Sequence, residues 1–230
     1  MEKREFTSRL SPLATVLVLL WLPMHVYGLP WLLVHVGGMT DYEINFVSYA
    51  VGAVYLVAVG FSFLRRDFDV LVEQPLRVLF QVAGCYGAML LMNMAVGGLL
   101  SFFTDPTANP NNEAVMELVS DSYGKMSAAA IFLAPIVEEM LFRAGIFSTL
   151  RHKSRWLAYL VTILLFGIYH VWGYALNDPM SWLYLVQYVP AGYLLCRCYE
   201  YSDSLWGSIF FHMLTNFVSL QLMQLAKELL

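Results

Sequence analysis

Long apolar stretches recur along this 230-residue chain and leave little polar sequence between them. Hydrophobic residues make up 59% of the chain and charged residues only 13%, whereas soluble domains are about a quarter charged. A stretch of about 20 apolar residues forms a helix that crosses the hydrocarbon core of a bilayer. The sequence therefore predicts an all-α, polytopic membrane protein whose helices pack into one bundle.

Seven stretches are long enough to be predicted as transmembrane helices. They cover residues 12–36, 46–64, 78–104, 126–150, 156–176, 183–198 and 205–226. The first is too long for a cleavable signal peptide, whose apolar region spans about 7–15 residues. An alternative interpretation makes it a broken re-entrant pair around Pro23 and Pro30. No internal repeat or linker divides the chain, so residues 1–230 are expected to form a single membrane-embedded domain.

Basic residues between the stretches predict the orientation, because Lys and Arg are enriched in cytoplasmic loops. With seven spans, only Lys125 and Lys227 fall on one side. The other side has Lys3, Arg4, Arg9, Arg65, Arg66, Arg77, Arg151, Lys153, Arg155 and Arg197. This asymmetry predicts a multi-pass protein of the cell membrane with its N-terminus in the cytoplasm. A re-entrant first segment would reverse the orientation. The polar hairpin 105–125 is expected to be a solvated outer loop.

Two functional classes are not supported by the composition. The net charge of −4 offers no basic surface for nucleic acid. The cysteines, Cys85, Cys196 and Cys198, lack the spacing of a zinc or redox motif. We expect them to be buried thiols.

The fourth predicted span contains ionisable side chains, Glu138, Glu139 and Arg143. An ionisable group at the centre of a bilayer costs at least about 2.5–3.5 kcal/mol, so it usually pairs with another group or does chemistry. Glu139 and Arg143 are four residues apart, with the acid first, as favourable pairing on a helix requires. We expect a structural ion pair between them. Glu138 is then left without a local cation and is free to act on water.

Two later spans supply further polar groups. His170 follows Phe166 by four residues, and His212 and Asn216 share a helix face by the same spacing. An imidazole could help Glu138 deprotonate water, while a second imidazole and an amide could donate to a developing oxyanion. The depths of these side chains along their predicted spans argue against a shared site. At 1.5 Å per residue, His212 lies about 10 Å from the cytoplasmic start of its span, but His170 and Glu138 lie about 20 Å in.

These motifs resemble those of the CPBP (ABI) intramembrane proteases, which include type II CAAX prenyl endopeptidases and bacteriocin-processing or self-immunity proteins. The family pattern E-E-x-x-x-R corresponds to residues 138–143, F-x-x-x-H to 166–170, and H-x-x-x-N to 212–216. The motifs occur in the family's order within residues 126–216, and the first three spans match no motif. The resemblance implies that Glu138 activates water with help from His170, and that His212 and Asn216 stabilise the oxyanion.

The same resemblance implies hydrolysis of a peptide bond in a membrane-associated substrate. A prenylated CAAX peptide, a leader peptide and a membrane-protein segment all stay open as that substrate. Family members have also been described as metal-dependent, and Glu138, His170 and His212 could form a zinc site with an open position. A site without cofactor is favoured, because no H-E-x-x-H pair lies on one helix.

Two other functions compete with proteolysis. The chain could be a non-enzymatic immunity or scaffold protein that keeps these residues for stability. It could also be a proton-coupled transporter, because Glu and His in spans build proton relays. A transporter would be expected to contain inverted repeats, and the sequence contains none that we detect.

Overall fold

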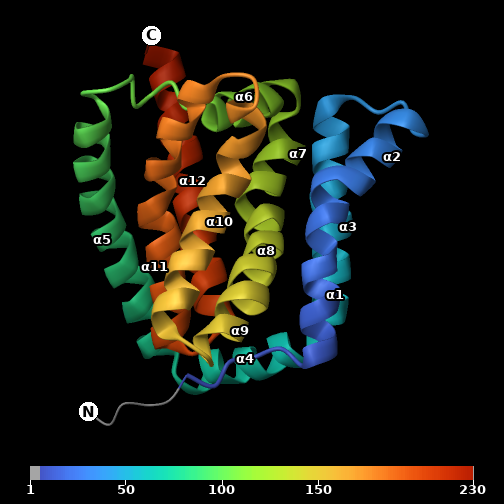
Figure 1. The fold of residues 1–230 in the computed structure, drawn as a ribbon, viewed down its shortest axis with the longest axis vertical. Coiled ribbons are helices and arrows are strands. Elements are labelled where there is room, and N and C mark those ends of the chain that lie inside the picture. The colour runs from blue at the N-terminus through green and yellow to red at the C-terminus, as the bar shows by residue number, and fades with distance from the viewer. Residues whose placement is uncertain (1–5, 230) are drawn as a thin grey trace.

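The computed structural model describes residues 6–229, which form helices joined by short turns (Figure 1). The described residues contain no strand, and Lys3 and Arg4 lie outside them. In chain order the elements are α1 (Pro12–Pro23), η1 (Met24–Gly28), α2 (Leu29–His35), α3 (Asp41–Val59), α4 (Phe61–Glu73), α5 (Pro75–Leu100), α6 (Pro110–Asp121), α7 (Tyr123–Ala128), η2 (Ala129–Leu133), α8 (Ala134–Glu138), η3 (Glu139–Phe147), α9 (Ser148–Arg151), α10 (Arg155–Ala175), η4 (Pro179–Gln187), α11 (Tyr188–Ser202) and α12 (Leu205–Leu229).

Five helical segments are long and apolar enough to cross a membrane: Pro12–His35, α3, α5, α10 and Leu205–Lys227. The other two predicted spans also run through the bundle, but their helical winding changes along the way. Residues 126–150 pass through α7, η2, α8, η3 and α9, and residues 183–198 pass from η4 into α11. The described part of the chain, residues 6–229, begins and ends at opposite ends of the bundle (Figure 1), as an odd number of crossings requires.

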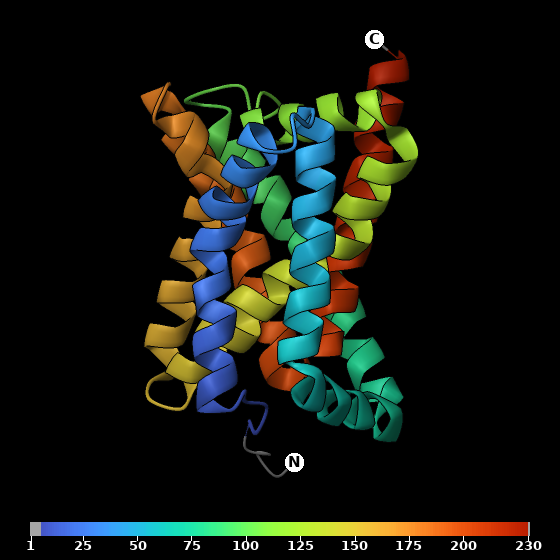
Figure 2. The same cartoon turned by 90° about the vertical axis from the view of Figure 1, so that its right-hand side faces the viewer.

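The first predicted span is one helical run, so the alternative of a re-entrant pair is wrong. The π-helical turn η1 lies between Pro23 and Pro30, and it lets the run continue past both prolines. Figure 2 shows α1 beside α3, with α4 beneath α3.

The second predicted span ends earlier than expected. A capping box formed by Thr40 and Glu43 starts α3, and the helix stops at Val59. Gly60 then separates it from α4, which lies along the lower end of the bundle (Figure 1). Phe63 and Leu64 of α4 are buried, while its basic residues are exposed. Such an amphipathic helix suits the membrane surface rather than its interior.

Helix α4 also positions the start of α12. Asp67 of α4 is buried, and its Oδ2 accepts a hydrogen bond from the Leu205 backbone N–H at 2.8 Å. Ser204 Oγ donates to the Asp67 carbonyl at 2.7 Å, and both Ser204 and Leu205 are buried. Helix α12 therefore begins inside the bundle, above α4. This start places its side chains deeper than a count of residues from the surface suggests.

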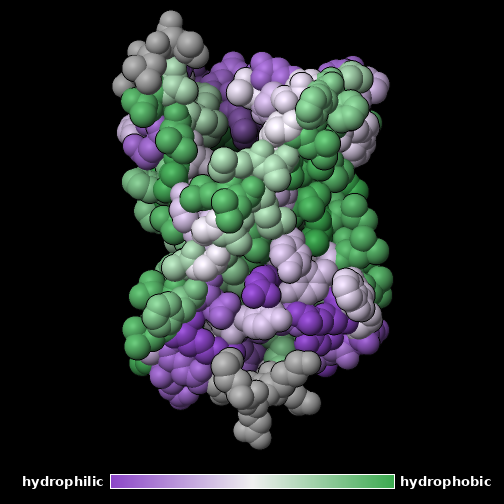
Figure 3. Space-filling model, turned by 90° about the vertical axis from the view of Figure 1, so that its left-hand side faces the viewer, coloured by the Kyte–Doolittle hydropathy of each residue, from purple (hydrophilic) through white to green (hydrophobic). Residues whose placement is uncertain are grey.

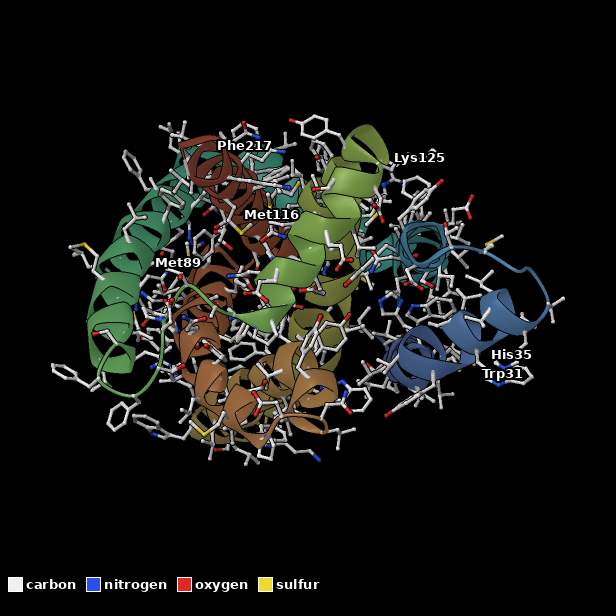
Figure 4. The ribbon with its side chains drawn as sticks, turned by 90° about the horizontal axis from the view of Figure 1, so that it is seen from above. Trp31, His35, Met89, Met116, Lys125 and Phe217 are labelled. Carbon is white, nitrogen blue, oxygen red and sulfur yellow. The ribbon has the colours of Figure 1, made fainter. Side chains whose placement is uncertain are left out.

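The hairpin 105–125 is not the simple solvated loop that the sequence predicts. It contains α6, which lies across the end of the bundle that carries the C-terminus, as seen from above in Figure 4 around the labelled Met116. Asn109, just before α6, is buried and donates to Gln187 Oε1 of η4 at 2.6 Å. Trp31 and His35 of α2 point away from the bundle.

The outer surface is typical of a membrane protein. Large hydrophobic side chains such as Leu13, Val54 and Phe102 are exposed, and an apolar surface of this extent marks contact with a membrane or a partner. Figure 3 shows hydrophobic side chains along the sides and hydrophilic ones at the lower end. Arg151 and Arg155 at this end form ion pairs with Glu200 of α11. All three cysteines are buried, as predicted.

Candidate active site

A cavity of about 990 Å³ reaches from the end of the bundle that carries α6 to the middle of the helices. Glu138, His170, His212 and Asn216 all line it, so the structure brings together predicted site residues from α8, α10 and α12. Phe166 lines it too. The difference in depth expected from the sequence is absent, because α12 starts above α4.

The two oxygens of Glu138 have different surroundings. Oε1 accepts a hydrogen bond from Tyr49 of α3 at 3.3 Å. Oε2 is buried and has no hydrogen-bond partner among the described residues. It lies 3.7 Å from Nε2 of His170 and 3.7 Å from Nε2 of His212. One carboxylate oxygen thus faces both imidazoles.

Hydrogen bonds on the far side of each ring indicate which nitrogen carries the proton. His170 Nδ1 lies 2.8 Å from the Phe166 carbonyl oxygen, which can only accept, so Nδ1 donates. His212 Nδ1 lies 2.8 Å from Glu139 Oε1, which also accepts. In their neutral forms both rings therefore present a lone pair on Nε2. Three acceptors converge with no donor between them, which is a site for a small donor such as water.

Glu139 is the centre of a buried network. Its Oε1 accepts from Arg143 Nη1 at 3.0 Å, which confirms the predicted ion pair. His212 Nδ1 donates to the same carboxylate, and Ser208 donates to its other oxygen. Both Glu139 and Arg143 are fully buried, and neither lines the cavity. Their contact with the site is indirect, because Glu139 orients the His212 ring.

Phe166 links the same network to the other histidine. Its ring lies 4.4 Å from the Arg143 guanidinium carbon, a distance at which a cation interacts with the face of an aromatic ring. Its carbonyl accepts from His170 Nδ1. The spacing of four residues in F-x-x-x-H therefore supplies both a ring for Arg143 and an acceptor for the imidazole.

Asn216 is tied to an irregular stretch of helix. Ala134 N–H bonds to the Ala129 carbonyl, five residues back, so the chain is π-helical before Pro135. In that pattern the Ala130 carbonyl would pair with residue 135, but proline has no N–H. Asn216 Nδ2 donates to the Ala130 carbonyl instead, at 2.8 Å. One amide hydrogen is thereby occupied, and the second can still donate.

Sequence reasoning missed the tyrosines around Glu138. Tyr49 donates to the carboxylate and lies 3.2 Å from the Tyr169 hydroxyl of α10, and the Tyr188 ring stacks on His170 at 4.5 Å. His25 of η1 also lines the cavity and packs edge-on against Tyr49. The first and second spans, which match no motif, thus contribute side chains to the site. Only the dipeptide Tyr169-His170 gave a signal in the sequence, because it places a tyrosine beside a motif residue.

The sequence also predicted an alternative zinc site at these residues. Glu138, His170 and His212 have the donor atoms that zinc prefers. Among residues 6–229, however, no group of three or more His, Cys, Asp or Glu side chains is arranged to hold a metal ion.

Two comparisons with known proteins found similar sequences. A family model described as "Type II CAAX prenyl endopeptidase Rce1-like" matches residues 123–218, which include all three motifs. A protein of Bacillus subtilis (strain 168) named "Putative membrane peptidase YdiL" is 24% identical over 144 residues. That alignment covers 61% of this chain and 54% of the relative, so about half of the relative's length is matched. No solved structure matches the chain.

The matched segment contains every residue that the three motifs contribute to the cavity. The five apolar helices and the similarity to a membrane peptidase make this a multi-pass membrane protein. The motifs, the matched segment and this relative thus agree in making the chain similar to the type II CAAX prenyl endopeptidases and to a membrane peptidase.

Proposed function

We propose that this protein is an intramembrane endopeptidase in which Glu138 activates the water that attacks a peptide bond. The observation that supports the proposal most directly is the convergence of Glu138 Oε2 and two imidazole Nε2 atoms, each 3.7 Å from that oxygen. Oε2 is buried without a partner, and it lines a cavity wide enough for a peptide.

In the proposed reaction a water molecule donates one hydrogen to Glu138 and the other to His170. Glu138 removes the first proton as the water oxygen bonds to the carbonyl carbon of the substrate. The electron pair of the carbonyl moves onto its oxygen and forms a tetrahedral oxyanion. When the C–N bond breaks, Glu138 returns the proton to the leaving amine. The products are a carboxylic acid and an amine.

The proposed oxyanion donors are Asn216 and His212. Asn216 has a second amide hydrogen besides the one held by the Ala130 carbonyl. His212 can donate from Nε2 only as an imidazolium, with Nδ1 still bonded to Glu139. Each such donor is typically worth about 10²–10³ in rate.

A peptide-cleavage assay tests the proposal. Purified protein is incubated with a quenched fluorescent peptide library in ¹⁸O-labelled water, and heat-unfolded protein serves as control. We expect products from the folded protein alone, with ¹⁸O in the new carboxyl group. A folded protein that cleaves no member of the library would contradict hydrolysis and favour a scaffold or a transporter.

The proposed chemistry uses no metal, and this part is tested separately. Purified protein should contain far less than one equivalent of transition metal, and its cleavage rate should survive EDTA and phenanthroline. Stoichiometric zinc whose removal abolishes cleavage and whose return restores it would instead make Glu138, His170 and His212 ligands. In that case His212→Ala should lose the metal and Asn216→Ala should keep it.

A further inference from the structure

The mouth of the cavity lies at the end of the bundle opposite the basic residues. Its lining includes Asn93 of α5, Asn112 of α6 and Asn177, all near the end that carries the C-terminus. The floor is formed deeper in the bundle, where Glu138, Phe166 and His212 lie. The orientation predicted from the basic residues therefore turns the mouth towards the outside of the cell.

The described side chains that line the cavity include acids but no Lys or Arg. Of the residues that the structure describes around the cavity, none is Lys or Arg, and two are acids, Asp41 at the mouth and Glu138 at the floor. The cations of this end are engaged elsewhere. Lys227 donates to Ser120 at 3.0 Å, and Lys125 lies over the ring of Tyr42. A peptide that enters the cavity thus meets negative charge without a compensating cation.

A free C-terminal carboxylate close to the scissile bond is therefore disfavoured. Three residues of extended peptide span about 10 Å, so a carboxylate three residues beyond the bond would still lie inside the cavity. Such a group is usually recognised by Arg, Lys or a cluster of backbone N–H groups. Helix α6 starts at the mouth, but the N–H of Asn111 already donates to Asn109 Oδ1. An unpaired carboxylate buried near Glu138 would be repelled.

The polar wall is instead suited to an uncharged main chain. Carboxamides are the commonest polar side chains in the lining. Asn109 and Gln187 hold each other in place, and Gln187 Nε2 donates to the Pro106 carbonyl. The side chains of Asn45, Asn93, Asn112 and Asn177 hydrogen-bond to no other described residue. Each carboxamide offers both a donor and an acceptor, which match the C=O and N–H of an extended peptide.

We propose that the site cuts an internal bond in an uncharged or cationic extended segment that reaches it from the outer face of the membrane. The inference rests on the proposed hydrolysis. It excludes a substrate whose free C-terminus lies three residues beyond the cut, and it names the face from which the substrate comes.

Two matched peptides test the chemical part. Both share the sequence around a bond that wild-type protein cleaves, and both end three residues beyond it, one as an amide and one as a free acid. We expect kcat/KM at least tenfold higher for the amide. Asn112→Lys, which adds a cation at the mouth, should reduce this ratio. Ser101→Lys, exposed just after α5 at the same end but outside the lining, should leave it unchanged.

The outcomes separate the two proposals. If wild-type protein cleaves neither peptide nor any library member, the proposed hydrolysis fails. If it cleaves both peptides equally, or prefers the acid, hydrolysis stands and the inference is overturned. Equal ratios for Asn112→Lys and Ser101→Lys would show that charge at the mouth does not govern selection.

Sidedness is tested in vesicles whose protein orientation has been established by labelling. Amidated peptide added on the side of α6 should be cleaved, and peptide confined to the side of Lys153 should not. Cleavage only on the side of Lys153 would overturn the outer route while leaving the chemistry of the site intact.

Discussion

Single residues decide how the two oxygens of Glu138 are used. Tyr49 holds Oε1 at 3.3 Å, which leaves Oε2 towards the imidazoles. A hydrogen bond to a charged group is worth about 1.5–3 kcal/mol, which corresponds to at least about tenfold in rate. We predict that Tyr49→Phe lowers kcat by about that factor and leaves KM nearly unchanged, measured on a peptide from the library.

Tyr55→Phe is the matched control for this prediction. Tyr55 lies on the same helix, and its hydroxyl donates to the Leu17 carbonyl at 3.3 Å, remote from the cavity lining. If both variants lose activity equally, or if KM rather than kcat changes in Tyr49→Phe, Tyr49 does not position the carboxylate.

The buried ion pair predicts a different response for the neighbouring acid. Glu139→Gln leaves Arg143 buried without its charged partner, and breaking a buried pair costs about 3–5 kcal/mol. It also weakens the bonds from His212 and Ser208. We expect a lower thermal midpoint and lower activity together, measured by unfolding in detergent. An unchanged midpoint would contradict the structural role of the pair.

Residue spacing predicted some of these contacts and could not predict others. The four-residue rule placed Glu139 beside Arg143, and the structure confirms it. Tyr49 could not be found that way, because a tyrosine in an apolar helix without a motif looks like a packing residue. The bond from Asn216 to Ala130 depends on π-helical winding before Pro135, which a regular helix pattern does not contain.

At the scale of elements, α4 supports α12 through Asp67, which lies outside the membrane-spanning segments. Burial raises the pKa of Asp67 from 3.8 to about 6, although Ser8 and the Leu205 N–H donate to it. Between these two pH values the folded protein binds a proton here that the unfolded chain does not. The contribution of Asp67 to the free energy of unfolding therefore falls as pH rises through this window and is constant above it.

Asp67→Asn tests this account, because asparagine resembles the uncharged acid. We predict that the thermal midpoint of the wild type, relative to that of Asp67→Asn, falls as pH rises from 3.8 to about 6. The comparison with the variant removes the effect of other titrating groups. A constant difference across the window would mean that Asp67 does not titrate in the folded protein as described.

Hydropathy located the helices but not their breaks. Apolar Phe61, Phe63 and Leu64 continue the pattern beyond Gly60, so the sequence extended the second span into what is the separate helix α4. In the sixth predicted span, Pro190 does not mark the irregular part. The irregular segment is η4, which ends at Gln187, and Pro190 lies within the first turn of α11. A proline there needs no helical donor, because the first N–H groups of a helix are unpaired in any case.

At the scale of the whole molecule, the basic residues predict which end of the bundle faces the cytoplasm. The arrangement of the helices alone does not determine this orientation. We predict that a cysteine introduced at Asn112 reacts with an impermeant maleimide in intact cells. A cysteine at Lys153 should react only after permeabilisation. The native cysteines are buried and should give little background. The reverse labelling pattern would overturn the orientation, and with it the outer route to the cavity.

Replacement of Glu138 tests the central claim of this account most directly. Glu138→Gln keeps the shape of the side chain but removes the base that faces His170 and His212. With the best library peptide, we predict that turnover falls by about 10²–10⁴, the usual contribution of a general base, while the thermal midpoint stays close to that of the wild type. Glu117→Gln, exposed on α6 and outside the cavity lining, serves as the control. Turnover by Glu138→Gln comparable to that of the wild type would remove Glu138 from the mechanism.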